Sequence, residues 1–149
     1  MLGTAGPSAG YDVGQYLAQS SAVQAVVDEW GPADLTALGW GPAATEVITQ
    51  VFGTAPGQPS PALRAASPVS YVAAGDPPFL IIQGAEDSTV PATQSQEFAA
   101  RLQSASVPET LVMVQNAGHG LKPTGGVPTP SISQVNAMVV SFFVKQLGQ

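Results

Sequence analysis

The sequence contains no cysteine and only one histidine, His119. Without cysteine the chain cannot form disulfide bonds or thiolate metal sites, and one histidine is too few for a His-rich metal centre. We therefore expect no bound metal. Only four Lys and Arg residues stand against ten Asp and Glu residues, which gives a net charge of −6. A chain without a basic patch is not expected to bind nucleic acid.

Long apolar runs are absent as well. No stretch approaches the roughly 20 apolar residues that cross a bilayer, so we expect no membrane partner. Met1–Thr4 lacks the basic residues that open a signal peptide, which makes a cytoplasmic location the default expectation. Hydrophobic residues nevertheless make up 44% of the chain. Because a chain of 149 residues can bury a substantial core, we expect a single domain over residues 1–149.

Two short apolar runs are typical of strands that are buried on both faces. Phe79–Ile82 lies between a Pro pair and Gly84, and Thr110–Val114 repeats the pattern further along. An earlier candidate strand is Ala22–Asp28. Segments with helical spacing separate and follow these strands. The order predicts an α/β fold of about three parallel strands, flanked by helices and joined by right-handed crossovers.

Helical segments are indicated by apolar spacing and by Pro and Gly at their ends. The candidates are Thr45–Phe52, Pro61–Ala66, Ala92–Ser104 and a last helix that starts at Thr129–Pro130. Tyr11–Gln19 also has helical spacing, although Gly14 weakens it. Asp34 is interpreted as a helix cap or a residue near the site. Trp30 and Trp40 are either core residues or walls of a substrate pocket.

One ionisable side chain follows each of the two later strands. Asp87 comes after Phe79–Ile82, and His119 comes after Thr110–Val114. In parallel α/β sheets, ligands and chemistry collect at the C-terminal ends of the strands. An Asp that orients a His supplies two members of a nucleophile-activating triad. We therefore expect Asp87 and His119 to lie within hydrogen-bond reach at one end of the sheet.

A candidate for the third member lies near the start of the chain, where Gly6-Pro7-Ser8-Ala9-Gly10 forms a Gly-x-Ser-x-Gly motif. Such a motif suits a nucleophile elbow, because small residues permit a strained turn that exposes the serine. The elbow needs a buried strand before it, and Met1–Ala5 is a poor core strand. Two interpretations stay open: Ser8 is the nucleophile, or Ser8 is an ordinary loop residue.

These motifs together resemble the C-terminal half of an α/β hydrolase. The most similar branch is the esterase/lipase group, with its acetyl-esterase and feruloyl-esterase-like members. Asp87, in a Gly-x-x-Asp-x-x-Val-Pro stretch, matches the triad acid of that group, and His119, in Gly-His-Gly, matches its triad base. The resemblance implies a minimal or truncated α/β-hydrolase fold. Gln83 departs from the pattern, since the group usually has His before the glycine.

The start of the chain is a second departure. In the family, a stretch like Leu2–Gly6 lies at the end of the helix that follows the elbow, which would place the nucleophile upstream of Ser8. The three expected strands match the last three of the family's larger sheet, so Ala22–Asp28 would be an apolar edge. Because exposed apolar edges pair with other chains, we expect a homodimer, built across that edge or by exchange of the N-terminal segment.

The resemblance implies a serine-hydrolase-type carboxylic ester hydrolase. Its catalytic residues would be Ser8, Asp87 and His119, its substrate a small ester, and it would need no cofactor. Two alternatives remain open at this point. The chain could be an inactive hydrolase remnant without a nucleophile, or a dimeric interaction domain that keeps the fold without its chemistry.

Overall fold

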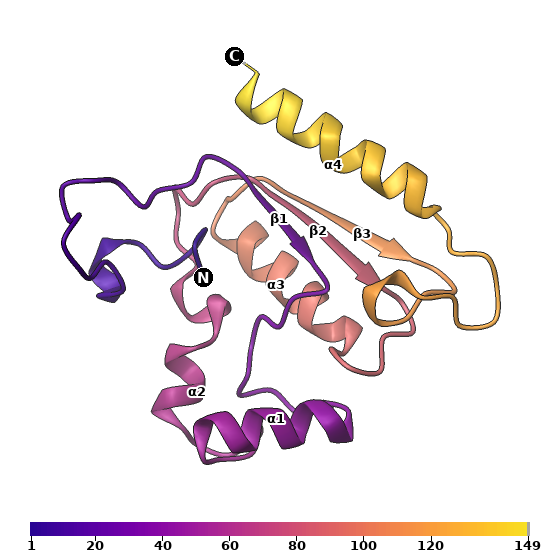
Figure 1. Ribbon diagram of the computed structural model, residues 1–149, viewed down its shortest axis with the longest axis horizontal. Coiled ribbons are helices and arrows are strands. Elements are labelled where there is room, and N and C mark those ends of the chain that lie inside the picture. Colours follow the sequence, from indigo (N-terminus) through magenta and orange to yellow (C-terminus); the bar gives the residue numbers. More distant parts are fainter. Residues whose placement is uncertain (149) are drawn as a thin grey trace.

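The computed structural model describes residues 1–148 and contains one parallel sheet (Figure 1). The strands are adjacent in the order β1 (Val26–Glu29), β2 (Phe79–Gly84) and β3 (Glu109–Val114). The predicted α/β class with three parallel strands is confirmed. The described helices are α1 (Pro42–Phe52), α2 (Pro61–Ala65), α3 (Ala92–Ser104) and α4 (Ile132–Leu147), with short 3-10 turns η1 (Pro7–Ala9), η2 (Pro68–Tyr71) and η3 (His119–Leu121).

The central strand β2 organises the core, because all of its residues are buried. Its side chains alternate between the two faces of the sheet. Phe79 and Ile81 pack towards α3, where the ring of Phe98 meets Phe79 edge-on with centroids 5.4 Å apart. Leu80 and Ile82 pack on the opposite face, which α4 covers. The sheet is therefore the middle layer between α3 and α4 (Figure 1).

A second, smaller core joins α1 and α2 outside these layers. It is built by Leu35, Ile48 and Leu63, and Trp40 packs against it. The indole N–H of Trp40 donates to the carbonyl of Ala37 at 2.9 Å. The structure therefore supports the interpretation of Trp40 as a core residue.

The predicted strand over 22–28 is too long at its start, because β1 begins at Val26. The N–H of Val26 donates to Pro78 O at 3.0 Å, and the ladder with β2 begins with the pair Val26 and Phe79. The helical interpretation of Tyr11–Gln19 is also wrong, since the chain is irregular there and Gly14 has a φ of 107°. β2, β3 and α3 have the expected positions.

Two helices start at other residues than the spacing predicts. α1 begins at Pro42, three residues before Thr45, with Gly41 as its N-cap. α4 begins after Ser131, which forms a capping box with Gln134, and not at Thr129–Pro130. Thr129 is instead paired with Gln115, in a bridge whose N–H···O distances are 2.8 and 3.1 Å.

Asp34 is not a helix cap, because its Oδ1 accepts from the N–H of Thr36 at 2.8 Å in a local turn. Its own N–H donates to Gln94 Oε1 of α3 at 2.7 Å. Within residues 1–148, no helix is both long and apolar enough to cross a membrane.

Candidate active site

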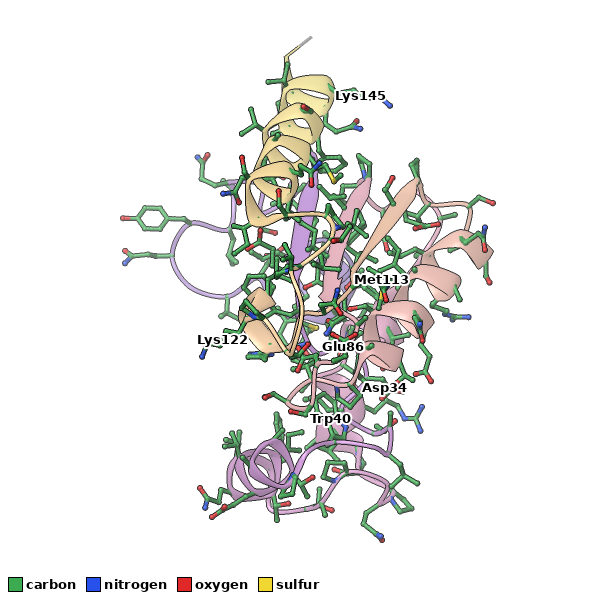
Figure 2. The ribbon with its side chains drawn as sticks, turned by 90° about the vertical axis from the view of Figure 1, so that its right-hand side faces the viewer. Asp34, Trp40, Glu86, Met113, Lys122 and Lys145 are labelled. Carbon is green, nitrogen blue, oxygen red and sulfur yellow. The ribbon has the colours of Figure 1, made fainter. Side chains whose placement is uncertain are left out.

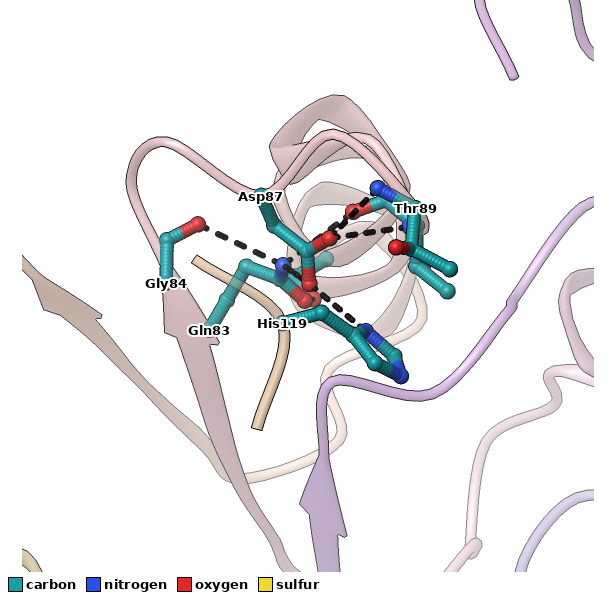
Figure 3. Close-up of polar contacts among 7 residues, drawn as sticks. Gln83, Gly84, Asp87, Thr89 and His119 are labelled. Carbon is teal, nitrogen blue, oxygen red and sulfur yellow. Dashed lines mark hydrogen bonds and ion pairs between the residues drawn. The ribbon is translucent and has the colours of Figure 1, made fainter. Parts of the chain in front are cut away.

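The carboxylate of Asp87 is held by four hydrogen bonds at the C-terminal end of the sheet. It lies in the turn after β2, and its side chain is fully buried. Its Oδ1 accepts from the backbone N–H groups of Thr89 (2.8 Å) and Val90 (3.0 Å). Its Oδ2 accepts from Gln83 Nε2 at 3.0 Å and lies 2.9 Å from His119 Nδ1 (Figure 3). These four partners match the acceptor capacity of an ionised carboxylate.

His119 follows β3 and meets Asp87 as its place in the sequence predicts. Because the carboxylate of Asp87 accepts, Nδ1 carries the proton and Nε2 keeps a free lone pair. The His119 side chain is 42% exposed, whereas that of Asp87 is 0% exposed. Figure 3 shows Nε2 pointing away from Asp87. The pair thus presents the basic nitrogen of an oriented imidazole at the surface.

Glycine at position 84 allows the loop that carries His119 to cross the end of β2. A Cβ on Gly84 would lie 2.5 Å from the carbonyl oxygens of both Ala117 and Gly118, closer than real Cβ contacts occur. The N–H of Glu86 donates to Ala117 O at 3.0 Å in the same crossing. The close approach of these two turns brings His119 to Asp87.

The exposed side chain of Glu86, labelled in Figure 2, joins the same two turns through hydrogen bonds. Its Oε1 accepts from the N–H of Asn116 at 3.3 Å, and its Oε2 accepts from Thr124 Oγ1 at 2.8 Å. Both partners belong to the segment after β3. The turns that carry Asp87 and His119 are therefore connected through backbone and side-chain hydrogen bonds.

Trp30 forms one wall beside the pair. It directly follows β1, has a positive φ of 48°, and donates its backbone N–H to Ile82 O at 2.8 Å. Its ring meets the His119 imidazole edge-on, with centroids 6.4 Å apart. Trp30 also packs against the core cluster on the α4 face. Unlike Trp40, it therefore contributes to both the core and the surroundings of the site.

Ser8 is not brought to this pair. It is exposed and lies in η1, and the preceding residues Gly6 and Pro7 border a hollow together with Val23 and Pro77, which come just before β1 and β2. Those residues mark the N-terminal ends of the strands. In Figure 1 this indigo part of the chain lies on the side opposite the strand tips.

A nucleophile elbow, which one of the two interpretations of Ser8 requires, is not formed there. Met1–Ala5 forms turns and not a strand, and η1 is followed by irregular chain. The turn contains Gly10 in a left-handed conformation, with a φ of 76°. Of the residues expected from the sequence, the structure joins Asp87 with His119 and leaves Ser8 apart.

Two contributors to the site were not predicted from the sequence. Gln83, noted only as a departure from the family pattern, donates to Asp87, and Ser95 of α3 donates to Gln83. The place of Gln83 next to Gly84 at a strand end was an available signal. Groups of three or more His, Cys, Asp or Glu side chains that could hold a metal do not occur within residues 1–148.

Comparison with known sequences finds similarity to esterases. Residues 1–102 match the model of the BD-FAE family. The chain is 32% identical over 79 residues to Esterase LipC of Mycobacterium tuberculosis (strain ATCC 25618 / H37Rv). The matched region covers 52% of this chain and 20% of LipC. It is 48% identical over 42 residues to Esterase LipQ of the same organism. This second match covers 28% of this chain and 10% of LipQ.

Solved structures of esterases are also similar to this chain. A truncated form of carbohydrate esterase from gut microbiota has a TM-score of 0.74 and 28% identity, over 93% of this chain and 47% of that one. Esterase 2 of Thermogutta terrifontis with propionate bound has a TM-score of 0.62 and 25% identity, over 88% of this chain and 46% of that one. The chain thus spans about half the length of these structures and a fifth or less of the two curated esterases.

The expected resemblance to esterases of the α/β-hydrolase fold is confirmed by these matches. The three parallel strands and flanking helices superpose on such enzymes over most of the chain. The family model covers well over half of the sequence. The chain therefore belongs to the BD-FAE family.

Proposed function

We propose that this chain carries the acid and the base of a carboxylic ester hydrolase. The observation that carries the proposal is the buried Asp87 carboxylate, hydrogen-bonded to His119 Nδ1 at 2.9 Å, while the His119 side chain stays 42% exposed and Nε2 points away from Asp87 (Figure 3). A serine hydroxyl is a weak nucleophile until a base accepts its proton. Nε2 of His119 is free for this task, and Asp87 fixes the tautomer and stabilises the imidazolium that forms. The esterase relatives support the same chemistry.

In the proposed reaction, Nε2 of His119 accepts the serine proton while the serine oxygen attacks the ester carbonyl carbon. The imidazolium then donates that proton to the departing alcohol, and an acyl-enzyme remains. Water, activated by the same nitrogen, releases the carboxylic acid and restores the serine. A short acyl group is the proposed substrate class, since propionate is bound in one structural relative.

The remaining part of the proposal is the nucleophile. Ser8 can serve only if Met1–Ser21 reaches the other end of the strands. The alternative is a serine supplied by a further polypeptide segment or a second copy. The half-length overlap with the esterase structures supports this alternative.

We also propose a homodimer, because one edge of the sheet is unpaired in the described residues. In the described part of the chain β1 pairs only with β2, so its outer edge has no ladder partner. We expect light scattering at micromolar concentration to show twice the mass of one chain, and a stable monomer would contradict this.

A second candidate function is a dimeric interaction domain without catalysis. It is favoured by the exposed apolar side chains of α4, among them Met138, Val140 and Val144. Hydrolysis of a short-chain aryl ester separates the two candidates. Esterase function predicts a burst of phenol release that His119→Ala abolishes and Glu97→Gln, an exposed change on α3, leaves intact. The absence of any rate above that of His119→Ala would favour the interaction domain.

A further inference from the structure

We propose that Gln83 is a positioning residue for Asp87 and His119, and that Ser95 of α3 fixes the orientation of its amide. This inference rests on the proposed function, because it concerns the same site. It also assigns a role to the one position in the acid-bearing stretch where the chain departs from the pattern of its group.

The amide nitrogen of Gln83 lies in a setting that only a donor can occupy. The side chain is fully buried. Its Nε2 lies 3.0 Å from Asp87 Oδ2, 3.2 Å from Val90 O and 3.4 Å from Gly84 O (Figure 3). All three neighbours are acceptors. An oxygen in the place of Nε2 would face them without a proton, at a cost typical of an unpaired buried polar group.

Ser95 supplies the matching partner at the other end of the amide. Its side chain is fully buried, and its hydroxyl donates to Gln83 Oε1 at 2.9 Å. A flipped amide would place Oε1 against the three acceptors and Nε2 against the hydroxyl. The three acceptors around Nε2 therefore specify one orientation of the amide, and the Ser95 hydroxyl, which donates to Oε1, holds that orientation and connects α3 to the site.

The consequence concerns the second oxygen of Asp87. Oδ1 is held by two backbone N–H groups, which belong to the turn itself. Within residues 1–148, the partners of Oδ2 are instead two side chains, Gln83 and the partly exposed ring of His119. Gln83 thus keeps Oδ2 in place when the imidazole moves, so that the carboxylate continues to select the Nδ1–H tautomer. Loss of that donor leaves the imidazole itself as the only partner of Oδ2.

The single histidine makes a direct test available. Because His119 is the only histidine, its ring nitrogen signals in a ¹⁵N NMR spectrum belong to one residue. We expect the purified chain to show predominantly the Nδ1–H tautomer. Gln83→Met keeps the length and volume of the side chain and removes the donor. This variant should show a mixture of both tautomers and faster exchange of the Nδ1 proton with water.

Gln94→Met is the matched control, because Gln94 of α3 is also a fully buried glutamine. Its Oε1 accepts from the N–H groups of Ala33 (3.0 Å) and Asp34 (2.7 Å), and its bonds do not involve Asp87. It should lower the free energy of unfolding by a similar amount and leave the His119 signals unchanged. Equal changes in both variants would overturn the proposal, because they would report general loosening of the fold.

A second variant covers the case in which Gln83→Met does not fold. Ser95→Ala removes only the hydroxyl that orients the amide, and it should shift the His119 signals in the same direction by a smaller amount. Unchanged signals in the folded variants would also overturn the proposal. In an active esterase, Gln83→Met should reduce kcat about tenfold or more with little change in KM. A wild-type chain without esterase activity would contradict the proposed function and leave the NMR result readable.

Discussion

Two acids, the buried Asp87 and the partly buried Asp28, have different surroundings. Asp87 lies at the site edge, which we define as Gln83–Val90 with Asn116–Leu121, and it has four hydrogen-bond partners. Asp28 lies in β1, near the start of the chain. Burial raises the pKa of Asp28, and the Gly31 backbone and the Met1 amino group only partly offset this effect. Burial alone therefore does not make a carboxylate useful for catalysis; the donors around it determine whether the charged form is held in place.

The same contrast separates the site edge from the N-terminal segment, Met1–Ser21. At the site edge, backbone and side-chain contacts hold Asp87 and His119 together. The N-terminal segment contains the Gly-x-Ser-x-Gly motif, but most of its residues are exposed and it adds no strand to the sheet. A sequence motif forms a nucleophile elbow only where a strand and a helix hold the turn. The turns of the site edge are held by such contacts, and the Gly-x-Ser-x-Gly motif of the N-terminal segment is not.

The largest expected effect is the loss of catalysis when the site edge loses its acid. Asp87→Asn keeps the shape of the side chain but favours the wrong His119 tautomer, so we expect ester hydrolysis to fall by about 10⁴-fold. Asp76→Asn is the control outside the site edge, because Asp76 only accepts from the N–H of Ala73 in a turn before β2. Steady-state hydrolysis of an aryl ester measures both. Similar rates for the two variants would remove the distinction between the regions.

The next effect is on stability and compares two glycines. Gly84→Ala places a Cβ 2.5 Å from two carbonyl oxygens, so we expect the free energy of unfolding to fall by about 1–3 kcal/mol. Gly6→Ala in the N-terminal segment meets no atom within 4 Å and has a φ of −67°, so its effect should stay within about 0.5 kcal/mol. Urea denaturation measures both values. A Gly84→Ala variant as stable as the wild type would show that the crossing of the turns is not tight.

Much of this edge could be predicted from sequence because its signals are local. The Pro pair and Gly84 delimit β2, and two ionisable residues follow successive strands. The start of α4 was missed because Thr129 pairs with Gln115, which is distant in sequence, although the Ser131 capping box is a local signal.

The surroundings of the pair could not be predicted in the same way. Ser95 reaches Gln83 from α3, and Trp30 reaches His119 from the end of β1. Contacts of this kind depend on how the layers pack, and no spacing rule describes them. The irregular course of Tyr11–Gln19 was missed because two apolar residues at helical spacing outweighed Gly14 in the sequence interpretation.

A smaller effect should appear at Asp28 as a dependence of stability on pH. Burial raises the pKa of Asp28 above its ordinary value of 3.8. The folded state therefore favours the protonated acid, and this stabilisation is complete below pH 3.8 and lost as the pH rises through the raised pKa. Asp28→Asn cannot ionise, so its stability relative to wild type should increase from pH 4 to pH 7 in urea denaturation. A variant that loses stability relative to wild type over this range would contradict the assignment.

The smallest effect is expected at Ser8, and it tests the comparison of the two regions most directly. Ser8 is exposed in η1, and its neighbours border residues at the N-terminal ends of the strands, away from His119. We therefore expect Ser8→Ala to change ester hydrolysis less than about twofold, as Ser21→Ala should in the same segment. His119→Ala should abolish the activity.

If Ser8→Ala instead fails as completely as His119→Ala, the two residues act as a unit, because members of a triad do not contribute additively. The N-terminal segment would then have to reach the site edge in solution, and the contrast between the regions would describe only one conformation. If Ser8→Ala keeps the activity that His119→Ala loses, the nucleophile lies in another segment or another copy. If neither change affects a weak background rate, the Asp87–His119 pair is an inherited structure without its chemistry, and the interaction domain becomes the better account of the chain.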